Sequence, residues 1–93
     1  MTYPSAAELI ANARAEIDAI DRLMVELLIR RCDVASRIGA VKREQGLPVF
    51  DPAREAKLLS RLAEQARPPL TPEVIATVWK SILEASRAVQ HRF

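Results

Sequence analysis

Apolar residues recur every three or four positions through the first half of the chain, which is the spacing of one face of an α-helix. From Ser5 to Glu44 the only residue that disfavours a helix is Gly39, close to the end of the segment. Arg31 stands where the next apolar residue of the series is due. The pattern therefore predicts one long helix with an arginine in its buried face. The apolar members are Ile10, Ala13, Ile17, Ile20, Met24, Leu27, Val34, Ile38 and Val41.

Glycines and prolines divide the remainder of the chain. Residues 43–52, REQGLPVFDP, are expected to form a loop, and Asp51 followed by Pro52 has the sequence of a capped helix start. A second helix is predicted from about residue 52 to about 65, because Pro68 and Pro69 cannot continue it.

Thr71 followed by Pro72 repeats the start signal, and a third helix is predicted to reach about Arg92. No segment alternates apolar and polar residues as a strand does. The sequence predicts an all-α fold of one long and two shorter helices in a single domain over residues 1–93. The predicted buried face of the third helix is Ile75, Val78, Ile82, Ala85 and Val89.

The predicted helix lengths indicate a homodimer. At 1.5 Å per residue the first helix spans about 55 Å, the second about 20 Å and the third about 30 Å. The two short helices cannot cover the long one, and a chain of 93 residues builds only a small core by itself. Two long helices packed together, with the short helices filling the remaining space, would bury the whole face.

Composition narrows the class of protein. A net charge of +2 and only 4% aromatic residues argue against a nucleic-acid surface. Cys32 is the single cysteine, which leaves no intrachain disulfide and no cysteine-based metal site. No apolar run is long enough to span a membrane, and the residues after Met1 do not have the pattern of a signal peptide. We expect a cytoplasmic protein.

Three basic residues of the long helix are candidates for ligand binding. Lys42 lies about 20° from Arg31 around the helix axis, and the two share one stripe. Arg14 lies about 100° from that stripe, so in a dimer it would reach the site of the partner chain. The alternative is ordinary: Arg14 could pair with Asp18 on the surface, and Lys42 could extend into solvent at the helix end.

Further polar residues lie on the two shorter helices. Asp51, Arg54 and Glu55 open the second helix, and Arg54 opposes the helix dipole there, so it has no capping role. Ser86 and Gln90 are four residues apart and share one face of the third helix. They could simply bond to one another beside the apolar face.

This set of side chains suits a small dianion that carries a hydroxyl group. It contains several cations, carboxylates, an amide and a hydroxyl, but no pair of nucleophile and base. His91 is the only histidine and is expected to be exposed. Such a site would act by placing its substrate and stabilising charge rather than by covalent attack.

The sequence resembles the all-helical chorismate mutases along nearly its whole length. The resemblance lies in ARAEIDAIDRLMVELLIRR, IGAVKREQGLPVFDPAREAKLL and SRAVQ, and VFDPARE after a long helix ending in lysine is the most specific part. It implies an intertwined homodimer that converts chorismate to prephenate by a cofactor-free Claisen rearrangement in aromatic amino-acid biosynthesis.

The resemblance also implies roles for individual residues. Arg14 would be lent to the partner's site, and Arg31 would grip a substrate carboxylate from within the chain. Lys42 and Gln90 would contact the ether oxygen of the bond that breaks. The remaining matches are expected to bind substrate: Arg54 at the start of the second helix, Asp51 and Glu55 near the ring hydroxyl, and Ser86 through a carboxylate or loop-side contact.

Other functions remain open at the level of sequence. An isochorismate–pyruvate lyase of salicylate synthesis resembles the same family, although Glu55 favours the mutase. A catalytically silent helical partner of an aromatic-pathway synthase is a second alternative, but it would be expected to lack some of the matched residues. A structural coiled coil would not explain Arg31 and Lys42 on one buried stripe.

Overall fold

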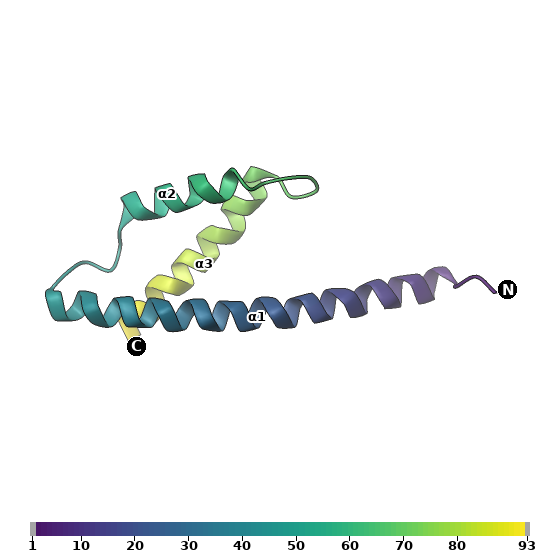
Figure 1. Ribbon diagram of the computed structural model, residues 1–93, viewed down its shortest axis with the longest axis horizontal. Coiled ribbons are helices and arrows are strands. Elements are labelled where there is room, and N and C mark those ends of the chain that lie inside the picture. The colour runs from purple at the N-terminus through teal and green to yellow at the C-terminus, as the bar shows by residue number, and fades with distance from the viewer. Residues whose placement is uncertain (1, 93) are drawn as a thin grey trace. The chain divides into compact units, whose positions relative to one another are not determined.

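The computed structural model describes residues 2–92 and contains three helices, α1 (Ala6–Gln45), α2 (Pro52–Ala63) and α3 (Pro72–Arg92) (Figure 1). The described part of the chain holds no β-strand. The all-α prediction is confirmed, and the helix ends lie within about two residues of those expected. The chain divides into two compact units at Arg30 and Arg31, so that α1 contributes to both. The prediction of a single domain stays a prediction.

Local signals account for the ends of the helices. The backbone N–H of Arg54 donates to the carboxylate of Asp51 at 3.0 Å, which caps α2 as predicted. At the end of α1, Gly46 adopts φ +66°, and the N–H of Leu47 donates to the carbonyl of Lys42 at 2.8 Å. This is the Schellman arrangement, in which a glycine takes a left-handed conformation that other residues disfavour.

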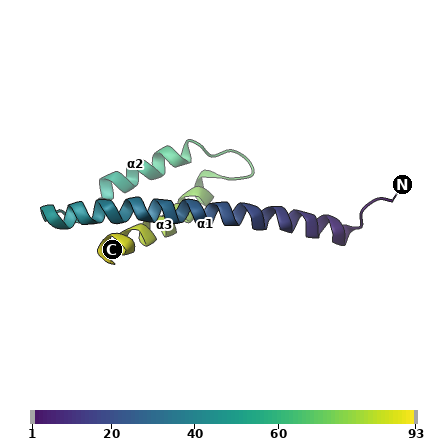
Figure 2. The same cartoon turned by 60° about the horizontal axis from the view of Figure 1, so that its bottom comes forward.

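The core of the second unit is small and lies along α3, which packs against α2 and, near its C-terminal end, against α1. Ala35 and Gly39 of α1 are buried, and so are Ile75 and Leu83 of α3. Both views place the C-terminal end of α3 against α1 (Figures 1 and 2). Small side chains at positions four apart on α1 let the two helices approach closely.

The predicted buried face of α3 was partly wrong. Val78 is 41% exposed and Ala85 is exposed as well, whereas Leu83 and Ser86 are buried. The prediction followed apolar residues alone, but the inner face of α3 includes polar side chains that line a cavity. A face that mixes serine with leucine cannot be recognised from apolar spacing.

The predicted apolar face of α1 is exposed in the first unit. Five of its large members are between 51% and 58% exposed: Ile10, Ile17, Ile20, Met24 and Leu27. Exposed apolar surface of this extent is typical of an interface with another chain. The homodimer stays a prediction. In residues 2–92, no helix combines the length and the apolar character that crossing a membrane requires.

Candidate functional site

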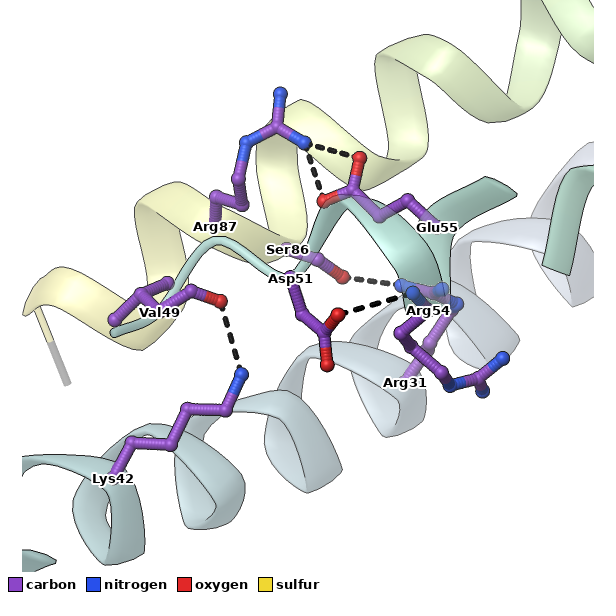
Figure 3. A network of polar contacts seen from close by, with 8 residues as sticks. All are labelled: Arg31, Lys42, Val49, Asp51, Arg54, Glu55, Ser86 and Arg87. Carbon is purple, nitrogen blue, oxygen red and sulfur yellow. Dashed lines mark hydrogen bonds and ion pairs between the residues drawn. The ribbon is translucent and has the colours of Figure 1, made fainter. Parts of the chain in front are cut away.

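A cavity of about 510 Å³ lies in the second unit, between the C-terminal part of α1, the start of α2 and the second half of α3. A volume of this order is typical of sites for small molecules. The polar side chains in its wall come from all three helices, and Figure 3 shows most of them. They are Arg31, Lys42, Asp51, Arg54, Glu55, Ser86, Arg87 and Gln90.

Arg31 is held by a hydrogen bond across the cavity wall. Its Nη1 donates to the hydroxyl of Ser86 on α3 (Figure 3). Ser86 is only 6% exposed, so this bond satisfies a buried polar group. Because a guanidinium has five N–H donors, Arg31 keeps others for a ligand. The Arg31 side chain is thus oriented before any ligand arrives.

Lys42 is held by the loop that connects α1 to α2. Its Nζ donates to the carbonyl of Val49 at 2.9 Å, and its side chain is partly buried (Figure 3). An ammonium group has three N–H donors, so two remain for a ligand. The wheel argument that placed Lys42 on the stripe of Arg31 is confirmed, since both line the same cavity.

Glu55 forms an ion pair that the sequence did not predict. The Nη1 of Arg87 on α3 lies 2.6 Å from each carboxylate oxygen of Glu55 on α2 (Figure 3). The guanidinium carbon of Arg87 also lies 5.0 Å from the centroid of the Phe50 ring. Arg87 therefore connects the loop, α2 and α3 at one edge of the cavity.

Gln90 has unused hydrogen-bonding capacity. Its side-chain oxygen is buried and has no hydrogen-bond partner among the described residues. A buried amide oxygen without a partner costs free energy, and such groups are uncommon in folded proteins. Because Gln90 lines the cavity, a ligand there can supply the missing contact.

The electrostatics of the cavity favour an anion with two negative charges. Four cationic side chains against two carboxylates leave a formal excess of two positive charges in the wall. No group of three or more metal-ligating side chains occurs in the part of the chain that the structure describes. His91 is exposed, as expected. The wall suits recognition of two carboxylates by several donors rather than nucleophilic attack.

The structure brings together seven of the eight predicted site residues. All except Arg14 line the cavity, and Asp51 does so while it caps α2. Arg14 lies in the first unit and is not part of the wall.

Sequence reasoning missed Arg87 and the carbonyl of Val49. Arg87 directly follows Ser86, but nothing in its spacing indicates a partner on α2. Val49 accepts the hydrogen bond of Lys42 through its backbone carbonyl, and a pattern of side chains in the sequence cannot indicate such a contact.

Comparisons with known proteins agree with the geometry. The family described as chorismate mutase type II matches residues 13–91. Chorismate mutase (Form II) from Thermus thermophilus is 34% identical, with a TM-score of 0.88, over 91% of this chain and 97% of that one. Chorismate mutase from Helicobacter pylori, solved in complex with prephenate, is 34% identical with a TM-score of 0.82, over 89% of this chain and 90% of that one.

A longer relative matches as well. The T-protein of Haemophilus influenzae is 32% identical over 87 residues, which are 92% of this chain but 23% of the T-protein. The chain therefore spans about a quarter of that relative's length. Since the family match covers most of the chain and includes every predicted site residue, the chain belongs to the chorismate mutase type II family.

Proposed function

We propose that this chain is a chorismate mutase that converts chorismate to prephenate in aromatic amino-acid biosynthesis, without a cofactor. The observation that carries the proposal is the cavity, whose wall combines cations from α1, α2 and α3 with the side chain of Gln90. The side-chain oxygen of Gln90 is buried and has no partner among the described residues. Chorismate has two carboxylates, an ether oxygen and a hydroxyl group, so its functional groups correspond to those of the wall. The relative from Helicobacter pylori was solved with prephenate, the product of this reaction.

The proposed reaction is an intramolecular rearrangement in which one C–O bond breaks while one C–C bond forms. The substrate must first adopt a compact conformer that brings its two carboxylates closer together. Arg31, already oriented by Ser86, holds one carboxylate, and Arg54 adds a second cation at the start of α2. Fixed cations offset the repulsion between the carboxylates and hold the reacting atoms in place.

Negative charge grows on the ether oxygen as the C–O bond breaks. Lys42 and Gln90 are proposed to donate to this oxygen, and they stabilise the transition state more than the substrate because the charge is larger there. The Lys42 side chain is held by its hydrogen bond to the carbonyl of Val49, and Gln90 is part of helix α3. Asp51 and Glu55 are proposed to accept from the ring hydroxyl.

We further propose a homodimer in which Arg14 completes the site of the partner chain. The support is the exposed apolar face of α1 in the first unit, together with the position of Arg14 about 100° from the stripe of Arg31. Arg14 of the partner chain would add a further cation to a wall that already holds Arg31, Arg54 and Arg87.

Identification of the product tests the proposed function directly. Purified protein mixed with chorismate is expected to form prephenate, followed by nuclear magnetic resonance or by acid conversion to phenylpyruvate. A parallel reaction with isochorismate, assayed for salicylate, tests the lyase alternative. Salicylate formation without loss of chorismate would refute the proposal, and no turnover of either substrate would favour a silent binding partner.

A further inference from the structure

Gly39 of α1 is in closer contact with α3 than any other residue type would allow. A Cβ atom built on Gly39 would lie 2.6 Å from the backbone carbonyl oxygen of Gln90 and 2.8 Å from its Cα. Carbon atoms do not approach backbone atoms this closely, so alanine at this position would push the end of α3 away. Gly39 is also buried, and its absent side chain makes room for Gln90.

Arg43, one helical turn further along α1, holds the same backbone group. Its Nη1 donates to the carbonyl oxygen of Gln90. Gln90 lies in the last turn of α3, where carbonyl groups have no partner within the helix. Arg43 thus supplies a charged donor to an acceptor that the helix leaves unsatisfied.

The two contacts act on the backbone of Gln90, while its side chain lines the cavity. Two residues of α1 contact the backbone of Gln90, and its side-chain oxygen has no protein partner in the described residues. A residue that is fixed at its backbone and keeps a side chain with free hydrogen-bonding capacity at a cavity is organised for a ligand. Gly39 and Arg43 therefore converge on one residue of the cavity wall, although neither lines the cavity itself.

We propose that Gly39 and Arg43 are positioning residues, and we call them the Gln90 seat. The seat fixes the position of the Gln90 amide relative to Lys42 of α1, and so sets how well the two act on one substrate atom. This inference rests on the proposed function for its kinetic test, but the seat itself is measurable without it. Misplacement of a catalytic group by about 1 Å can cost about 100-fold in rate.

A double-mutant cycle on kcat tests the proposal. Gly39→Ala is expected to lower kcat about 100-fold and to change KM little, because Gln90 acts in the transition state. In the background of Gln90→Ala, Gly39→Ala is expected to have almost no further effect, since the group it positions is already gone. Multiplicative losses in the double mutant, or wild-type kcat in Gly39→Ala, would overturn the proposal.

Arg43 provides a second test that does not depend on how well Gly39→Ala folds. Arg43→Met is expected to lower kcat with little change in circular dichroism, and Arg43→Lys is expected to recover part of the loss, because an ammonium group can still donate. Arg37→Met is the matched control: Arg37 is exposed on the same helix and has no side-chain hydrogen bond among the described residues. Equal losses in Arg37→Met and Arg43→Met would contradict the seat.

Hydrogen exchange separates failure of the seat from failure of the proposed function. Relative to the wild type, Arg43→Met and Gly39→Ala are expected to exchange faster at the backbone amides of residues 86–91, with unchanged exchange in α2. If the wild type does not convert chorismate, the function fails while this measurement still decides the seat. Unchanged exchange at residues 86–91 in both variants would refute it.

Discussion

Lys42 carries three N–H donors, and the structure uses one of them on the carbonyl of Val49. The other two are available at the cavity, so at the scale of single residues Lys42 is the strongest candidate for stabilising charge on the substrate. It also differs from a surface lysine in being partly buried and in having its position set by a loop.

Removing Lys42 is therefore expected to abolish nearly all activity. Loss of one preorganised donor to a developing oxyanion costs about 10²–10³ in kcat in other enzymes. Lys42→Ala should show at least that loss in a chorismate assay, with unchanged helical circular dichroism. Lys57→Ala, on the exposed side of α2, is the control and should keep wild-type turnover. Near-wild-type turnover in Lys42→Ala would refute the assignment.

The proposed role of Gln90 predicts how activity depends on pH when this residue is replaced by glutamate. An amide donates a hydrogen bond without first binding a proton. In Gln90→Glu the new side chain donates only when its carboxyl is protonated, and glutamate in water has a pKa of about 4.3. Ionised glutamate would also repel the growing charge on the ether oxygen. Activity of this variant should therefore rise as pH falls, while the wild type keeps its activity at neutral pH. Profiles of kcat against pH compare the variant with the wild type. A flat profile in the variant would count against Gln90 as a donor to the ether oxygen.

Among the helices, α2 and α3 both begin with a side-chain cap, but the two capping residues differ in their relation to the cavity. Asp51 caps α2 through the N–H of Arg54 at 3.0 Å, and Thr71 caps α3 through the N–H of Val74 at 3.2 Å. Only Asp51 also lines the cavity. The capping interaction is local, whereas the contribution to the cavity depends on where the helix start is placed.

The two caps are expected to separate stability from activity. Asp51→Ala and Thr71→Ala should each lower the free energy of unfolding by about 1 kcal/mol, measured at equal protein concentration. Asp51→Ala should also impair turnover, whereas Thr71→Ala should leave it unchanged. Asp51→Asn keeps a capping oxygen and should regain stability without regaining full activity. Equal activity in all three variants would show that Asp51 is only a cap.

At the scale of the whole molecule, the proposal requires two chains. Half-exposed isoleucine, leucine and methionine side chains along the first unit leave much apolar surface uncovered. Burial of such surface stabilises an assembly by about 25 cal/mol per Å², so a second chain would add substantially to a small core. In a dimer, each site would combine one chain's cavity with the other chain's Arg14.

Mixing two inactive variants tests this arrangement. Arg14→Ala and Lys42→Ala should each be nearly inactive alone. In a mixed dimer the two changes would fall in one site and leave the other intact, so unfolding and refolding an equal mixture should restore about a quarter of wild-type activity. Recovery would fail if Arg14 served the site of its own chain. Sedimentation of each variant confirms that the assembly itself is unchanged.

The helices, their ends and one wall of the cavity follow from local features of the sequence. Capping and left-handed turns depend on a few neighbouring residues, and the common stripe of Arg31 and Lys42 follows from helical geometry alone. The roles of the site residues came from resemblance to a family. Residues that lie on one helix were predictable because helix geometry alone relates them.

Contacts between residues of different helices became known from the three-dimensional fold. The ion pair of Glu55 with Arg87 and the burial of Ser86 depend on how α3 crosses its neighbours. The contact of Gly39 with Gln90 joins residues far apart in the chain. It is possible because glycine has no Cβ atom, which would clash with the backbone of Gln90. Helix periodicity specifies which face a residue occupies but not what that face packs against, because the crossing is set by the packing of all the side chains together.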